Sequence, residues 1–326
     1  MKHLYIFFIL SYSSFLWAEE ASYGWNIPNS SINIGGYLDM TYDQKREEKF
    51  LFNDIAMLFS ANQNRFDLLG ELELSHISLD GKSNSRADVD LNIERLKLSY
   101  LLSDTQSIQV GRFNSDIGYW NQAPIMILQD TGTAPHLINH LFPKATMGIL
   151  YQQDVGEESS FSLTFQHNKD IAHQERNTLL YQEKVLSIDR HIGFSYHGVK
   201  ENLSWRFSAG AYRETNKKKS LYMGIGSEYD GEEFSIEAEL FTQSSNKESE
   251  DKPYSGYLQS TWHFQASQDA VVRFENYQDN TLDIKEQIYL LGYAYRPTNN
   301  IVVKSEYIYH SELPLSRFVY SISVLF

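Results

Sequence analysis

The chain ends with Arg317-Phe318-Val319-Tyr320-Ser321-Ile322-Ser323-Val324-Leu325-Phe326. Counted back from the last residue, every second position is apolar or aromatic, and the residues between them are smaller or more polar. Strict alternation with a period of two is typical of a β-strand that has one face in an apolar phase. The stretch therefore predicts a closing strand whose apolar face carries Phe318, Tyr320, Ile322, Val324 and Phe326.

The first residues of the chain have the pattern of a secretory signal peptide. A cationic start at Lys2 precedes the apolar run Leu4–Trp17, and Ala18 is followed by two glutamates. This run is shorter than the roughly 20 residues that a helix needs to cross a bilayer. We therefore expect residues 1–18 to be a signal peptide that is removed after Ala18.

The composition fits a protein of the cell envelope. Cysteine is absent, so neither disulfides nor thiolate metal sites are expected. Aromatic residues reach 14%, with 22 Tyr and 19 Phe, although the mean hydropathy is negative. Lipid-facing and lumen-facing residues alternate in a transmembrane barrel, which produces this combination. The formal charge of −14 argues against nucleic acid as a partner.

Alternating segments separated in turn by short turns and longer polar loops fill the rest of the chain. They predict an all-β, transmembrane antiparallel β-barrel of about 16 strands over residues 31–326, after a short periplasmic segment at 19–30. The predicted strands are Ile32–Tyr42, Phe50–Ala61, Arg65–His76, Ile93–Leu102, Ser107–Phe113, Thr146–Gln152, Ser160–His167, Arg190–His197, Leu203–Arg213, Leu221–Tyr229, Phe234–Gln243, Tyr254–Phe264, Ala270–Tyr277, Ile284–Arg296, Ile301–His310 and Ser316–Phe326.

Two stretches resemble known bacterial outer-membrane proteins. A closing strand that ends in Phe is similar to the C-terminal signal that outer-membrane barrels present to their assembly machinery. The passage from Gln109 to Asn121, with Val-Gly-Arg-Phe at 110–113, resembles the strand-to-loop passage of phosphate-selective porins. The resemblance implies a bacterial outer-membrane porin, surrounded by lipid and lipopolysaccharide, that passes small solutes or ions and forms a homotrimer.

The third long loop, Asn114–Ala145, is the longest connection, at about 32 residues. By resemblance to general porins we expect it to fold into the barrel and narrow the pore. We expect its apolar stretch 124–128 to pack against the inner wall rather than against a neighbouring subunit. The predicted constriction residues are Asp116, Asp130, His136, His140 and Lys144.

A single lysine in this loop is too few cations for a phosphate-selective constriction. His136 and His140 have no obvious third ligand in the sequence, so we expect no metal and no cofactor.

The polar positions that alternate with apolar ones along the strands carry charges of both signs in nearly equal number. They predict a water-filled channel of modest ion selectivity, although they can equally pair into structural ladders along the inner wall. The predicted lumen-facing charges are Glu71, Glu73, Arg95, Lys97, Arg206, Glu237, Glu239, Arg273, Glu275, Lys304 and Glu306.

Two alternatives to a porin remain at this stage. A barrel hydrolase would need a nucleophile and a base, and His191 and Ser195 share a strand face but lie about 13 Å apart along it. No other catalytic motif is present in the sequence, so we expect no enzyme. A non-conducting barrel would bind a partner through charged loops such as Glu214–Lys219 and Ser244–Lys252.

Overall fold

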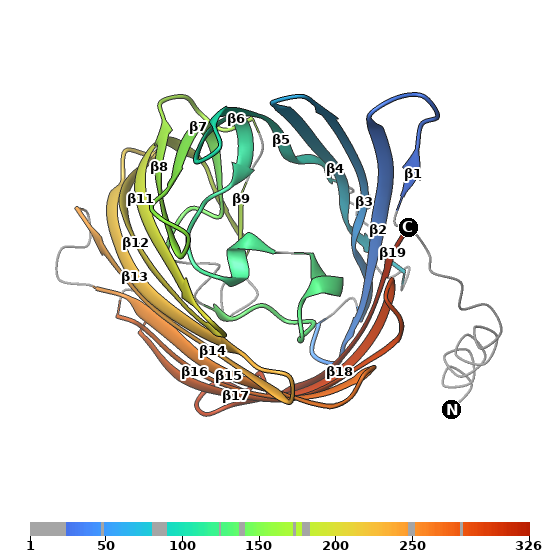
Figure 1. Cartoon of the computed structure of the whole chain (residues 1–326). Coiled ribbons are helices and arrows are strands. Elements are labelled where there is room, and N and C mark those ends of the chain that lie inside the picture. Colours follow the sequence, from blue (N-terminus) through green and yellow to red (C-terminus); the bar gives the residue numbers. More distant parts are fainter. Residues whose placement is uncertain are drawn as a thin grey trace.

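The structure is a computed structural model that describes residues 24–46, 49–79, 90–123, 125–136, 141–171, 174–177, 183–246, 252–280 and 283–326. Sixteen antiparallel strands form one closed barrel (Figure 1). These strands are β2 (Ile32–Asp43), β3 (Phe50–Gln63), β4 (Phe66–Ser78), β5 (Asp90–Ser103), β6 (Gln106–Asn114), β7 (Ala145–Asp154), β8 (Ser159–Gln166), β11 (Ile188–Lys200), β12 (Leu203–Glu214), β13 (Lys219–Asp230), β14 (Phe234–Ser245), β15 (Tyr254–Gln265), β16 (Gln268–Asp279), β17 (Ile284–Thr298), β18 (Ile301–His310) and β19 (Arg317–Leu325).

The predicted fold class and strand number are confirmed, and each predicted strand overlaps one strand of the barrel. Two short strands that do not belong to the barrel sheet, β9 (Gln174–Asn177) and β10 (Glu183–Leu186), pair with each other in the connection between β8 and β11. The prediction of a signal peptide at 1–18 lies outside the described residues.

The ring closes where the last strand pairs with the first long one. β19 pairs with β2 from Val319↔Asp43 to Leu325↔Tyr37, and Phe326 exchanges two backbone hydrogen bonds with Gly36, of 2.7 and 2.8 Å. β1 (Trp25–Asn26) pairs with Ile34 and Asn33 of β2. The N-terminal part of the described chain thus lies against β2 just beyond the C-terminus of the protein.

The exterior of the barrel is apolar because the alternation of each strand turns its large apolar residues outward. In β13, Leu221, Met223 and Ile225 are exposed, while Tyr222 and Gly224 between them are buried. In β19 the members of the predicted apolar face alternate with the buried Val319, Ser321 and Ser323. A closed sheet with an apolar outer surface has no unpaired edge and is stable in a bilayer. The chain is therefore an outer-membrane β-barrel.

Aromatic side chains pair with one another on neighbouring strands near the strand ends. Tyr42 and Phe50 have ring centroids 4.8 Å apart, and so have Tyr307 and Phe318. Aromatic belts of this kind are typical of the two bilayer interfaces. None of the helices in the described ranges is long and apolar enough to cross a membrane.

Candidate functional site: loop 3 and the barrel lumen

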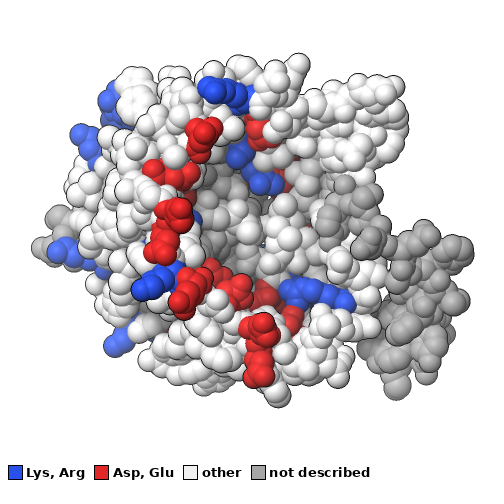
Figure 2. All heavy atoms as spheres, in the orientation of Figure 1, with Lys and Arg blue, Asp and Glu red and all other residues white. Residues whose placement is uncertain are grey.

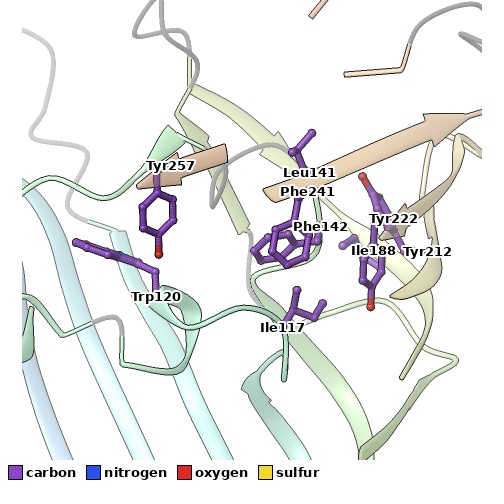
Figure 3. Close-up of a cluster of buried hydrophobic side chains, with 9 residues drawn as sticks. All are labelled: Ile117, Trp120, Leu141, Phe142, Ile188, Tyr212, Tyr222, Phe241 and Tyr257. Carbon is purple, nitrogen blue, oxygen red and sulfur yellow. The ribbon is translucent and has the colours of Figure 1, made fainter. Parts of the chain in front are cut away.

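The connection between β6 and β7, residues 115–144 and called loop 3 below, turns into the barrel. Its two short 3-10 helices, η1 (Trp120–Gln122) and η2 (Met126–Leu128), lie inside the ring of strands (Figure 1). A buried cluster joins the loop to β11–β15 (Figure 3). Its members are Ile117, Trp120, Leu141, Phe142, Ile188, Tyr212, Tyr222, Phe241 and Tyr257. Burial of these aromatic and aliphatic groups fixes the loop on one side of the lumen.

The start of loop 3 is held by a polar cluster around Asp116. Its carboxylate forms an ion pair with Arg206 of β12 and accepts a hydrogen bond from Ser162 of β8. The Asp116 carbonyl accepts a hydrogen bond from Ser195 of β11. A residue predicted at the constriction thus contacts a predicted lumen charge directly. Whether either residue governs ion passage stays a prediction.

Tyr119 binds the wall through both its backbone and its side chain. Its N–H donates to Glu239 Oε1 at 2.8 Å, and its hydroxyl accepts a hydrogen bond from Ser204 at 2.8 Å. Burial raises the pKa of the Tyr119 hydroxyl to about 12, although the Ser204 hydrogen bond acts in the opposite direction. Glu239 also accepts a hydrogen bond of 2.9 Å from Tyr257, whose hydroxyl contacts Glu237 as well.

The middle of loop 3 combines an apolar contact with an ion pair. Ile127 packs against Ala294 and Val302 on the inner wall, so the apolar stretch lies inside the barrel as expected. Asp130 accepts a 2.6 Å hydrogen bond from Thr261 and lies 3.4 Å from the guanidinium of Arg296. Arg296 was not among the predicted site residues.

The segment of loop 3 at Thr131 and Thr133 is held by three charged residues of β16 and β18. Arg273 donates to the hydroxyl of Thr131 and the carbonyl of Thr133, both at 2.9 Å. Lys304 donates to the Thr131 carbonyl at 3.1 Å, and Glu306 accepts a 2.7 Å hydrogen bond from Thr133. These charged side chains satisfy the hydrogen-bonding groups of the backbone and of the threonine hydroxyls in this part of the loop.

The remaining predicted loop residues contribute backbone groups. His136 donates its N–H to Glu275 at 2.7 Å, and its ring lies edge-on to Tyr277. The carbonyl of Lys144 accepts hydrogen bonds from Ser115 and Asn121. His140 lies outside the described residues. No group of three His, Asp or Glu side chains with the geometry of a metal site occurs in the described ranges.

The inner face of β2–β5 carries a second set of charges. Tyr37 donates to Glu71 at 2.7 Å and contacts Glu73 at 3.2 Å, and Arg95 forms an ion pair with Glu71. Lys97, two residues further along β5, donates to Gln109 at 3.3 Å. The apolar stretch of loop 3 reaches β19 and lies beside Leu58 of β3. The charged residues of β4 and β5 line the inner wall beyond that contact.

Arg112 is a structural residue that the sequence did not reveal. Gly111 has a φ of +126°, and a Cβ there would lie 2.1 Å from the Leu96 carbonyl, so only glycine fits. Beyond this position β6 leaves β5, and the Arg112 guanidinium donates to the carbonyls of Ile93 and Glu94 that have no strand partner there. Its Nε lies 3.0 Å from Asp170, and both side chains are 1% exposed. The Val-Gly-Arg-Phe passage thus closes a gap in the wall.

His191 and Ser195, the pair considered for hydrolysis, have separate partners. His191 is 2.9 Å from Thr146 and 2.9 Å from the Tyr222 hydroxyl, and its side chain is buried. Ser195 is 3.0 Å from Ser208. The pair therefore forms no nucleophile–base arrangement, and these residues anchor the base of loop 3.

The fold and the lumen define the class of protein: an outer-membrane β-barrel with a long loop folded into its interior. Solved structures of porins share this fold. The chain is similar to the anion-selective porin from Comamonas acidovorans (13% identity, TM-score 0.64, covering 91% of this chain and 100% of that chain). It is similar to OmpF of Salmonella typhi in complex with daunomycin, with 11% identity and a TM-score of 0.67, covering 91% of this chain and 98% of that chain. It is also similar to the outer-membrane channel DcaP of Acinetobacter baumannii, with 12% identity and a TM-score of 0.60, covering 94% of this chain and 100% of that chain. No family model and no curated protein matches the sequence.

Proposed function

We propose that the protein is a passive diffusion channel for small hydrophilic solutes or ions. One observation carries the proposal: loop 3 is bound to β8 and to β11–β19, whereas the charged residues on the inner face of β4 and β5 lie beyond its contacts. Figure 2 shows one end of the molecule hollowed at its centre, with basic and acidic side chains inside the hollow. A polar wall beside a fixed loop supports a water-filled path.

The charges of the lumen support modest rather than strict selectivity. Acidic residues of loop 3 are paired with arginines, as are Glu71 and Glu275 of the wall. In the orientation of Figure 2, acidic side chains form an arc along the rim of the opening. The short turns supply exposed acids, including Asp104, Glu158 and Glu233. A channel of this kind selects solutes by their size and through the weak electrostatic field of its lumen, rather than through a dedicated ion-binding site.

The test is single-channel conductance of the refolded protein in a planar bilayer with a salt gradient across it. We expect stepwise, long-lived conductance, and the reversal potential will give the sign of ion preference. A correctly folded barrel, shown by heat-modifiable electrophoretic mobility, that gives no conductance would rule the channel out.

We further propose that the channel is exported by the signal peptide, inserted by the barrel-assembly machinery and assembled as a homotrimer. The alternating face of β19 supports the assembly signal. A trimer form of OmpT of Vibrio cholerae shares the fold, with 9% identity and a TM-score of 0.61, which supports the trimer. Deletion of Phe326 is expected to lower the yield of membrane-inserted barrel, and crosslinking in native membranes tests the trimer.

A further inference from the structure

An apolar cavity of about 230 Å³ lies between loop 3 and the strands that close the barrel. The large apolar side chains of its lining are Leu58 of β3, Ile125, Ile127 and Leu128 of loop 3, Leu325 of β19 and the following Phe326. Gly24 and, from β2, Asn33, Gly35 and Gly36 complete the lining. Leu128 at the end of η2 is 61% exposed although it belongs to a loop folded into the barrel. A leucine left open in a polar lumen offers a contact surface to an apolar group of a solute.

The size of this cavity suits a defined chemical group. A cavity of about 150 Å³ lined by Leu, Ile and Phe is large enough to hold benzene. The cavity beside Leu128 therefore accommodates a phenyl or a branched alkyl group.

Two cations lie on the wall beside the cavity. Leu58 is paired in register with Glu71, and Glu71 with Arg95, so Arg95 is two strands, or about 10 Å, from the cavity wall. Lys97 lies about 7 Å further along the same face. Among the described residues the Lys97 ammonium forms no ion pair, and it donates a hydrogen bond to the neutral Gln109 of β6.

Asp67 of β4 attracts Lys97, but two other acids of this wall, Glu71 and Glu73, are turned away from the positive edge. Glu71 is bound by both Tyr37 and Arg95, and its side chain is 4% exposed against 16% for Arg95. Glu73 shares the hydroxyl of Tyr37 and is buried. The wall therefore presents its cations to the lumen and holds these two carboxylates behind them.

We propose that this part of the lumen is a binding subsite for small organic anions with an apolar group, namely aryl or branched-alkyl carboxylates. The carboxylate is bound by Lys97 and Arg95, and the apolar group occupies the cavity beside Leu128 and Leu58. The inference rests on the proposed channel function and specifies the solute class that the channel retains longest during passage.

The experiment measures binding and conduction separately with three probes. These are 3-phenylpropionate, 3-phenylpropylammonium with the opposite charge, and acetate without the apolar group. Calorimetric titration of the refolded barrel gives affinity, and current fluctuations in a planar bilayer give residence time. We expect 3-phenylpropionate to bind at least about tenfold more tightly than either other probe, since both the charge and the apolar group contribute.

Two substitutions locate the subsite. Leu128→Asn and Lys97→Gln should each weaken 3-phenylpropionate binding about tenfold, whereas Val155→Asn, at an exposed apolar residue of a short turn, should not change it. Equal affinity for all three probes would overturn the subsite. Weakening by Leu128→Asn but not by Lys97→Gln would show a general apolar cavity, filled by lipid chains, and would also overturn it. Conductance without binding defeats this inference alone, and binding without conductance defeats the channel alone.

Discussion

Asp116 of loop 3 forms an ion pair with Arg206 of β12 across the junction between loop and wall. The two side chains are 24% and 12% exposed, so the pair is in contact with the lumen and is not a dry core interaction. The charge of each residue is therefore partly compensated by the other. A change at either position alters both the anchoring of the loop and the field in the lumen.

Replacing Asp116 with Asn leaves the Arg206 guanidinium without its carboxylate. We expect the reversal potential in a salt gradient to shift toward anion preference, with a stability loss of about 1 kcal/mol or less. Asp130→Asn, which leaves Arg296 with Asp269 as its carboxylate partner and removes one negative charge from loop 3, should shift it in the same direction. Asp104→Asn removes the same charge from an exposed short turn after β5, and as the comparison variant it should shift the reversal potential less than either loop variant. Unchanged reversal potentials in both loop variants would show that loop 3 does not set ion preference.

Replacing Arg112 with Met removes the positive partner of the buried Asp170 and the donor to two β5 carbonyls. Breaking a buried ion pair by removing one partner costs about 3 kcal/mol or more, so the denaturation midpoint of the refolded barrel should fall markedly. The double variant Arg112→Met, Asp170→Asn should recover part of the loss because the buried charge is gone. A single variant as stable as the parent would contradict the role assigned to this pair.

Gly111→Ala and Gly156→Ala form a matched pair of variants. Both glycines have positive φ, of +126° and +73°, but a Cβ at Gly111 meets the Leu96 carbonyl, whereas a Cβ at Gly156 meets nothing within 4 Å. We expect Gly156→Ala to cost about 1 kcal/mol and Gly111→Ala about 3 kcal/mol, measured by thermal denaturation. Similar losses at both positions would mean that the close approach at Gly111 is unimportant.

Burial raises the pKa of Tyr119 to about 12. We therefore expect the anchoring of loop 3 through Tyr119 to weaken at strongly alkaline pH. The folded state holds the phenol proton more tightly than the unfolded chain does. Its contribution to stability is therefore complete below pH 10 and is lost as the pH rises from 10 toward 12.

An ultraviolet difference titration between the parent and Tyr119→Phe should show one tyrosine that ionises near pH 12. Ser204→Ala removes the hydrogen bond that opposes the shift and should move this ionisation higher. A Tyr119 signal that is complete at pH 10 would contradict the burial of this side chain.

The strands could be predicted from the sequence because alternation is a local property. Each of the sixteen is visible as a period-two run, and β19 together with Phe326 shows it in ten consecutive residues. The inward position of 124–128 was also accessible, because an apolar stretch in a wet loop needs a partner surface.

The anchoring of loop 3 could not be predicted in the same way. The Asp130–Arg296 contact joins residues 166 positions apart, and no periodic pattern connects them. Arg112 and Asp170 are similarly separated, by 58 positions, and each looks like an ordinary polar residue near a strand end. Such pairs depend on the path of a loop through the lumen. A charged residue directly after a strand glycine, as Arg112 follows Gly111, was the one local signal of a special position.

The hydrogen bonds between Phe326 and Gly36 extend the ladder between β19 and β2. Every other ladder of the ring connects strands that are closer in sequence, and long-range contacts of this kind form slowly. Until β19 pairs with β2, the sheet has two free edges that are open to pairing with other chains. A variant that lacks β19 therefore exposes the edge of β2, and such a sheet is open to association with a second copy.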